Sequence, residues 1–231
     1  MPSDFLLSDL AEVTVYADGT VIVPGPQAEI FPPPALRSLL SGTLSKAEVA
    51  ALLDEAEKAG LTRGDRRLAD DRIADAPSTR FLVRSGGKTS TVDVYALHES
   101  ESEITRPILE FEERVLNTGS KAATMPYTPD RIRLVLARPA DQPSPEPGQP
   151  PELDPGNVPW PLTASPDEFG QKAADEGFFD RCGVVQGKDL LLMRPALENS
   201  NTRTHWTGGS GDWLVIARPL LPGEPGCEEL L

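Results

Sequence analysis

The density of prolines restricts the secondary structure of one stretch of this chain more than any other sequence feature does. Residues 140–161 contain eight prolines in 22 positions. Proline lacks a backbone N–H and fixes φ, so neither a helix nor a sheet interior tolerates this density. We therefore predict a long surface loop or a linker there. It separates an N-terminal module, residues 1–139, from a smaller C-terminal module, residues 162–231, and we expect the two to pack as one domain.

Short β-branched runs joined by glycine-containing turns predict antiparallel hairpins. The dipeptide Asp18-Gly19 lies between two such runs and tolerates the positive φ angles of a tight turn. In the hairpin around Gly86-Gly87, apolar residues alternate along the second strand, which leaves one face for solvent. The predicted hairpins cover residues 13–23, 79–95 and 203–217, and further strands are expected at residues 131–137 and 182–185.

The helix predicted over residues 46–59 has the most complete signal. Ser45 and Glu48 have the spacing of a capping box, and Gly60 lies where glycine often follows a helix. Further helices are expected at residues 106–117 and 188–198. The pattern predicts an α+β fold, with a mainly antiparallel sheet built from hairpins, about three covering helices and a long proline-rich loop.

Two segments of similar sequence end in Arg-Pro. Residues 134–139 read Leu-Val-Leu-Ala-Arg-Pro, and residues 214–219 read Leu-Val-Ile-Ala-Arg-Pro. Our preferred interpretation is that proline ends strand pairing and that arginine protects an exposed sheet edge. The alternative is an internal repeat of two related halves.

The charge of the chain argues against several partners. Acidic residues outnumber basic ones by 36 to 22, which gives a net charge of −14, and the excess occurs in both halves. Such a surface repels phosphate backbones and anionic lipid, so we expect no nucleic-acid partner and no binding to a membrane surface. Because no run of 18 apolar residues occurs, membrane attachment would need a lipid anchor ahead of the chain.

The two cysteines, Cys182 and Cys227, favour a disulfide. Neither His98 nor His205 has zinc-motif spacing to them. A bond that closes 45 residues would stabilise the fold by about 4 kcal/mol. Two unrelated buried thiols are the alternative. Since a disulfide implies an oxidising compartment, we expect an extracellular or envelope-anchored protein. The first residues lack a signal-peptide pattern, so this location requires a leader ahead of them.

Two short motifs resemble catalytic loops. In residues 85–89, the end of a phosphate-loop pattern is present, but Leu82 stands where the first glycine is required. In residues 208–212, Asp212 stands where a serine-hydrolase elbow needs its second glycine. We interpret both as hairpin turns, and His98, beside several glutamates, as a surface histidine.

One acidic cluster has the potential to bind a cation. Asp65, Asp70, Asp71 and Asp75 offer several carboxylate oxygens, which suit calcium. Interleaved arginines neutralise this segment, and its spacing lacks the EF-hand pattern. We therefore interpret it as a solvated loop, with a calcium site as the alternative, and expect no other cofactor.

The third hairpin carries the predicted ligand-binding residues. The sequence leaves open whether Trp206 and Trp213 share a face. If Trp213 points inward, we expect Trp206 and His205 to form an exposed pair with Arg203 nearby. Such a pair can stack on a flat ligand or anchor a partner side chain. On this hypothesis, Trp206→Ala weakens partner binding by more than about 1 kcal/mol and leaves the fold intact. The alternative is that the aromatic residues only stabilise the sheet.

Three stretches together resemble a known protein family. Residues 16–19, 44–61 and 213–227 resemble a family of secreted or lipid-anchored proteins from high-GC bacteria, and 16 arginines against 6 lysines suit such a genome. The resemblance implies a leader or lipoprotein anchor before the first hairpin and paired cysteines at positions like Cys182 and Cys227. It implies no known activity.

The sequence predicts a class of function rather than a reaction. We expect a non-enzymatic extracytoplasmic binding or structural module whose partner is a protein or glycan of the cell envelope. The alternative is a hydrolase whose carboxylates come together only in the fold. A cleft with two carboxylates of raised pKa would favour the hydrolase, and a flat aromatic patch the module. The oligomeric state is not predicted.

Overall fold

The chain has an α+β fold, as predicted, with helices and mostly antiparallel sheets. The structure is a computed structural model that describes residues 7–69, 73–100, 102–139, 156–173, 178–228 and 230. It divides into two compact units. Unit 1 consists of Met1–Leu10, Pro24–Leu39 and Tyr127–Leu231, and unit 2 consists of Ala11–Val23 and Leu40–Pro126.

These units do not follow the boundaries expected at residues 139 and 162. The reason is the pairing of the strand β8, Arg131–Ala137, which the sequence analysis assigned to the N-terminal module. Both of its neighbours, β11 (Arg181–Gln186) and β13 (Gly211–Pro219), come later in the chain. Strand pairing therefore joins segments on both sides of the proline-rich stretch into one unit.

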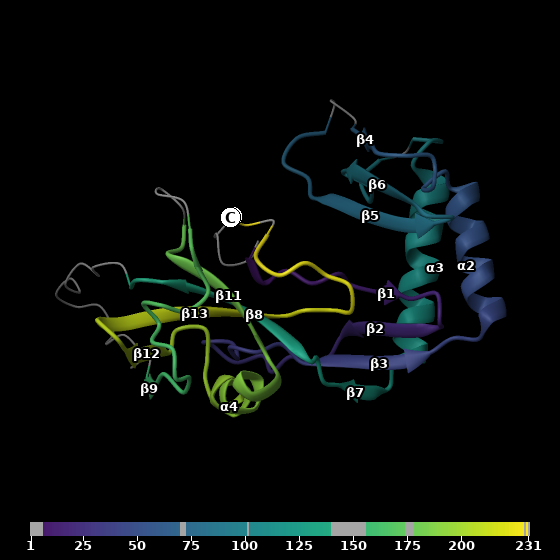
Figure 1. The fold of residues 1–231 in the computed structure, drawn as a ribbon. Helices are drawn as coiled ribbons and strands as arrows, with labels where there is room; N and C mark the ends of the chain where they lie inside the picture. Colours follow the sequence, from purple (N-terminus) through teal and green to yellow (C-terminus); the bar gives the residue numbers. More distant parts are fainter. Residues whose placement is uncertain are drawn as a thin grey trace. The chain divides into compact units, whose positions relative to one another are not determined.

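Unit 1 is built on a six-stranded sheet in which neighbouring strands are antiparallel except for one parallel pair. Its helix α4, Gly187–Glu198, packs Leu190, Met193 and Leu197 onto one face of the sheet. The opposite face is covered by the segment that follows β13, and Figure 1 shows this segment and α4 on either side of the sheet. The strand order in this sheet is β10 (Gln171–Lys172), β11, β8, β13, β12 (His205–Gly208), β9 (Asn157–Pro159).

The two Arg-Pro segments are the central strands of this sheet. Leu134 pairs with Ala217 and Ala137 with Leu214, so β8 and β13 lie side by side and antiparallel. The prediction that their arginines protect an exposed edge is wrong, because each strand has a neighbour on both sides. The segments also belong to one sheet rather than to two separate halves.

The described part of the proline-rich stretch, residues 156–161, contains one regular element. Residues 140–155 lie outside the described residues, but Asn157–Pro159 forms β9, which pairs in parallel with β12. The prediction of a structureless stretch over all of residues 140–161 is therefore wrong at its end. Pro159 is tolerated because β9 is an edge strand, where a missing N–H breaks no ladder bond.

The described residues of unit 2 form two small sheets and two long helices. The helices are α2, Lys46–Lys58, and α3, Arg106–Ala122. One sheet has the order β1 (Thr14–Val15), β2 (Thr20–Pro24), β3 (Leu39–Thr43), β7 (Met125–Tyr127). The other has the order β4 (Arg66–Leu68), β6 (Lys88–Tyr95), β5 (Ser78–Ser85).

Each helix of unit 2 contributes to the core of both small sheets. Ala56 of α2 and Ile108 of α3 belong to one buried cluster with Val92 and Val94 of β6. Nearer the other ends of the helices, Leu52 and Val115 pack in a second cluster with residues of β2. Figure 1 shows the two helices side by side, with the β4–β6–β5 sheet near one end of the pair.

The predicted start of α2 is confirmed in detail. The Glu48 N–H donates to Ser45 Oγ at 3.2 Å, and the Ser45 N–H donates to Glu48 Oε2 at 2.7 Å. Helix α3 runs five residues beyond its predicted end at residue 117. Within the extension, the missing side chain of Gly119 lets the helix approach Val13, where a Cβ would lie 2.5 Å from a methyl carbon.

Candidate functional site

The predicted ligand contact Trp206 is fully buried, at 0% exposure, so the prediction of an exposed pair is wrong. The physical reason is the hairpin register. The turn contains only Gly209 and Ser210, not the six residues expected, and Trp206 pairs directly with Trp213. Directly opposed residues share a face of the sheet, so both tryptophans point into the core. The Trp160 ring packs edge-on against Trp206, with centroids 6.2 Å apart.

His205 and Arg203 are half-buried, but they do not share a surface with Trp206. His205 Nδ1 lies 3.9 Å from Asp212 Oδ2, across the hairpin. The backbone N–H of Arg203 donates to Asn201 Oδ1 at 2.8 Å, within a turn. The three predicted ligand-binding residues therefore do not form one exposed site.

The same hairpin carries a polar cluster that the sequence analysis did not find. The Arg138 guanidinium lies 3.6 Å from the Trp213 ring centroid and donates to Asp167 Oδ1 at 2.7 Å and to Ser210 Oγ. Asp167 also accepts from the Ser210 hydroxyl at 2.5 Å and from its N–H at 2.6 Å. We call Arg138, Asp167, Ser210 and Trp213 the Arg138 cluster.

The Arg138 cluster does not resemble a hydrolytic site. Hydrogen bonds from Ser210, followed by the charge of Arg138, hold the pKa of Asp167 below its ordinary value. Asp167 accepts directly from the Ser210 hydroxyl, and the cluster has no histidine that could act as the base of a serine nucleophile. The cluster instead ties residues 165–169 to the β12–β13 turn. Residues 208–212 include this hairpin turn, but it consists of Gly209 and Ser210 alone.

The aspartates proposed for calcium are only partly described. Asp70 and Asp71 lie outside the described residues. Asp65 Oδ1 accepts the Thr91 N–H at 2.8 Å, and Asp75 is exposed in a loop with φ of 55°. Within the described ranges, no three His, Cys, Asp or Glu side chains are placed to hold a metal ion. The calcium alternative therefore receives no support from them.

The predicted disulfide is present. Cys182 of β11 is bonded to Cys227, with an S–S distance of 1.99 Å, and both residues are buried. They pack with Leu7 and Val135 on the face of the sheet opposite α4. None of the described helices is long and apolar enough to cross a membrane.

A buried carboxylate lies in unit 2. Burial raises the pKa of Glu112, and the charge of His98, whose Nε2 lies 3.1 Å from Glu112 Oε2, opposes that rise. The His98 side chain is 56% exposed, which agrees with its interpretation as a surface histidine. Because the contacting partner of Glu112 is a histidine, this position does not supply the paired carboxylates of raised pKa expected for a hydrolase.

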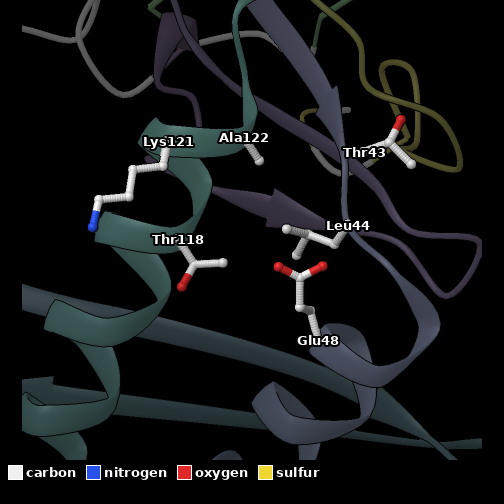
Figure 2. A pocket seen from close by; sticks show the side chains of 6 residues that line it. All are labelled: Thr43, Leu44, Glu48, Thr118, Lys121 and Ala122. Atoms are coloured by element: carbon white, nitrogen blue, oxygen red, sulfur yellow. The ribbon is translucent and has the colours of Figure 1, made fainter.

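A shallow hollow of about 300 Å³ lies between the start of α2 and the end of α3. Its polar groups do not converge: the carboxylate of Glu48 already accepts the Ser45 N–H, and Figure 2 shows the Lys121 amino group pointing away from Glu48. We therefore assign no ligand to it. Its lining residues are Thr43, Leu44, Glu48, Thr118, Lys121 and Ala122.

The outer face of the β4–β6–β5 sheet is a different kind of surface. Val92 and Val94 point toward the helices and are buried, so the alternate residues point outward. The register places Arg80 opposite Asp93 and Leu82 opposite Thr91. We call the outward residues the arginine face, and they are Arg67, Ser78, Arg80, Leu82, Arg84, Thr89, Thr91, Asp93 and Tyr95.

Positive charge dominates the arginine face although the chain as a whole is acidic. Three arginines share it with Asp93, which binds Arg80 Nε at 2.6 Å, and Asp65 borders it, where its Oδ1 accepts the Thr91 N–H at 2.8 Å. Among the described residues, no side chain pairs with the guanidinium of Arg67 or Arg84. Leu82 lies between the arginines of β5 and is 55% exposed. The alternation Arg-x-Leu-x-Arg over residues 80–84 is a signal that the sequence analysis did not use.

Comparison of the chain with known protein families, characterised proteins and solved structures gives no match. The resemblance to secreted proteins of high-GC bacteria therefore stays a prediction.

Proposed function

We propose that this protein is a non-enzymatic binding module that works outside the cytoplasm and binds an acidic segment of a partner protein on the arginine face. The observation that carries the proposal is the arginine face itself. In a chain of net charge −14, it gathers three arginines around an exposed leucine.

The local charge of this face can act independently of the net charge. Electrostatic interactions in water are screened over about 8 Å at physiological salt, so a partner in contact with Arg84 and Arg67 responds mainly to nearby groups. Guanidinium groups bind carboxylates with two parallel hydrogen bonds. An apolar centre such as Leu82 adds contact area that releases water.

A protein partner fits this face better than a glycan does. Sugar rings are commonly held by flat aromatic side chains, and the one aromatic residue of the arginine face is Tyr95, whose hydroxyl accepts the Ala76 N–H at 3.0 Å. The extracytoplasmic part of the proposal is supported by the Cys182–Cys227 disulfide, since such bonds persist in oxidising compartments.

A synthetic octaglutamate peptide tests the proposal. We expect its affinity for Arg67→Gln/Arg84→Gln to fall about fivefold or more below that for the wild type, and wild-type binding to weaken with added salt. Arg106→Gln/Arg114→Gln is the matched control, because these side chains of α3 are 60% and 59% exposed. Equal losses in the two double variants, or no binding by the wild type, would contradict the proposal.

A further inference from the structure

Strand β5 has an open edge. In the part of the chain that the structure describes, β5 is the last strand of the β4–β6–β5 sheet and pairs with β6 alone. Eight residues long, it is a long edge strand for a small sheet. An edge of this kind presents backbone N–H and C=O groups that can accept another strand.

The hairpin turn determines which backbone groups face this edge. Gly86 and Gly87 form a two-residue turn with φ of 57° and 73°, and Ser85 pairs with Lys88 beside it. The pair that flanks such a turn is hydrogen-bonded, and hydrogen-bonded pairs alternate along an antiparallel ladder. The N–H and C=O groups of Arg80, Leu82 and Arg84 therefore point away from β6, toward the open edge.

We infer that β5 binds an extended acidic segment of the partner protein as an added strand. This inference rests on the proposed function and specifies how the partner is held. The added strand forms backbone hydrogen bonds with Arg80, Leu82 and Arg84, whose side chains lie on the arginine face. Backbone bonding and side-chain recognition are thereby supplied by the same three residues.

The side-chain pattern of β5 defines a sequence preference. Residues directly opposite each other across a strand pair share a face, and their side chains interact. Acidic residues of the added strand would lie opposite Arg80 and Arg84, and an apolar residue would lie opposite Leu82. The partner segment is therefore expected to alternate acidic, any, apolar, any, acidic.

Charge argues against a second copy of this chain as the occupant. Antiparallel pairing of β5 with another β5 about Leu82 would place Arg80 opposite Arg84 of the second copy, at both ends of the contact. Like charges directly opposite each other destabilise a strand pair. An acidic segment removes this repulsion, so charge complementarity favours a different protein.

Two peptides of the same composition test the inference. One contains the alternating core Glu-Thr-Val-Thr-Glu, and the other contains the rearranged core Glu-Glu-Val-Thr-Thr, each in otherwise identical flanks. We expect the alternating peptide to bind the full chain about tenfold more tightly, because it alone places both carboxylates opposite arginines. Methylation of its backbone nitrogens that face β5 should abolish binding, and methylation of the alternate nitrogens should not.

Two variants of the protein test whether the open edge of β5 binds the peptide. Leu82→Pro removes an N–H that points away from β6 and leaves the ladder to β6 intact. We expect it to bind the alternating peptide about tenfold more weakly than Leu82→Ala, which loses the side chain alone. Circular dichroism checks that both variants fold. If Leu82→Pro does not fold, the methylated peptides alone test whether the peptide binds as an added strand.

The outcomes separate this inference from the proposed function. If both peptides bind equally well and binding is lost in Arg67→Gln/Arg84→Gln, the face binds acidic peptides without strand addition, and the inference fails while the proposed function stands. If neither these peptides nor octaglutamate binds, both fail. If sedimentation shows a dimer that Leu82→Pro dissociates, the occupant is a second copy, and the inference is overturned.

Discussion

Trp206 and Trp213 lie opposite each other on β12 and β13, and both indole rings are buried in the core of unit 1. We predict that Trp206→Ala lowers the free energy of unfolding by about 3–5 kcal/mol, because it leaves a large cavity beside Trp160. Urea unfolding followed by circular dichroism measures the change. Leu191→Ala is the control, since this side chain of α4 is 76% exposed, and its effect should stay within about 0.5 kcal/mol. Near-wild-type stability of Trp206→Ala would show that the residue is not in the core.

Removal of the Cys182–Cys227 disulfide is expected to destabilise the fold by about 4 kcal/mol, because the bond closes a loop over a sequence separation of 45. The comparison is between the oxidised wild type and the double variant Cys182→Ala/Cys227→Ala in urea. Dithiothreitol should lower the midpoint of the wild type and leave that of the double variant unchanged. A double variant as stable as the oxidised protein would mean that the bond contributes little.

Two glycines with similar backbone angles provide a matched test of the Arg138 cluster. Gly209 has φ of 61°, and a Cβ there would lie 1.8 Å from Asp167 Oδ2, whereas Gly187 has φ of 55° with open space around it. Gly187→Ala should lower the free energy of unfolding by about 1–2 kcal/mol, through the strain of its positive φ alone. Gly209→Ala should cost at least about 1 kcal/mol more, because Asp167 must move and its bonds to Ser210 weaken. Thermal unfolding of both variants gives the difference, and equal losses would refute the tight fit.

The buried carboxyl of Glu112 should make stability depend on pH. Burial raises the pKa of this carboxyl in the folded state above the ordinary value of 4.5. At pH values between 4.5 and the raised pKa, the folded state therefore binds more protons than the unfolded state. The free energy of unfolding therefore decreases as pH rises through this window. Glu112→Gln should abolish that decrease in urea titrations at a series of pH values. A decrease that persists unchanged in Glu112→Gln would assign it to another group.

His98 provides an independent check on the same carboxyl. Its charge lowers the pKa of Glu112 against the effect of burial, so His98→Ala should raise that pKa further. Carbon NMR of the labelled Glu112 carboxyl follows the titration directly. An unchanged titration curve in His98→Ala would mean that the two groups do not interact.

Local sequence signals predicted most of the elements. The capping box at Ser45 marks the start of α2, and Gly86-Gly87 marks the turn between β5 and β6, because both motifs act within a few residues. The strand at residues 131–137 was also predicted with its observed bounds. Its two neighbours in the sheet were not predicted, since they are set by packing between segments far apart in the chain.

The candidate sites could not be predicted for the same reason, because they depend on contacts between segments far apart in the chain. The register that buries Trp206 depends on a turn that is four residues shorter than its glycine-rich sequence indicated. The Arg138 cluster joins three separate segments, and no spacing rule connects residues 138, 167 and 210. On the arginine face, Arg80, Leu82 and Arg84 follow a two-residue period, but Arg67 reaches it only through the pairing of β4 with β6.

Unit 1 holds the two ends of the described chain close to one sheet. Arg133 of β8 donates to the backbone oxygen of Leu7 at 2.8 Å, and Arg218 of β13 donates to that of Asp9 at 2.6 Å. During synthesis, all of unit 2 is available once residue 126 has emerged, but residues 7–10 must wait for strands more than 120 residues later. Unit 2 can therefore fold first, while the partners of the N-terminal segment are still being made. Completion of unit 1 is therefore later than that of unit 2, and the Cys182–Cys227 bond joins two segments that both emerge after unit 2.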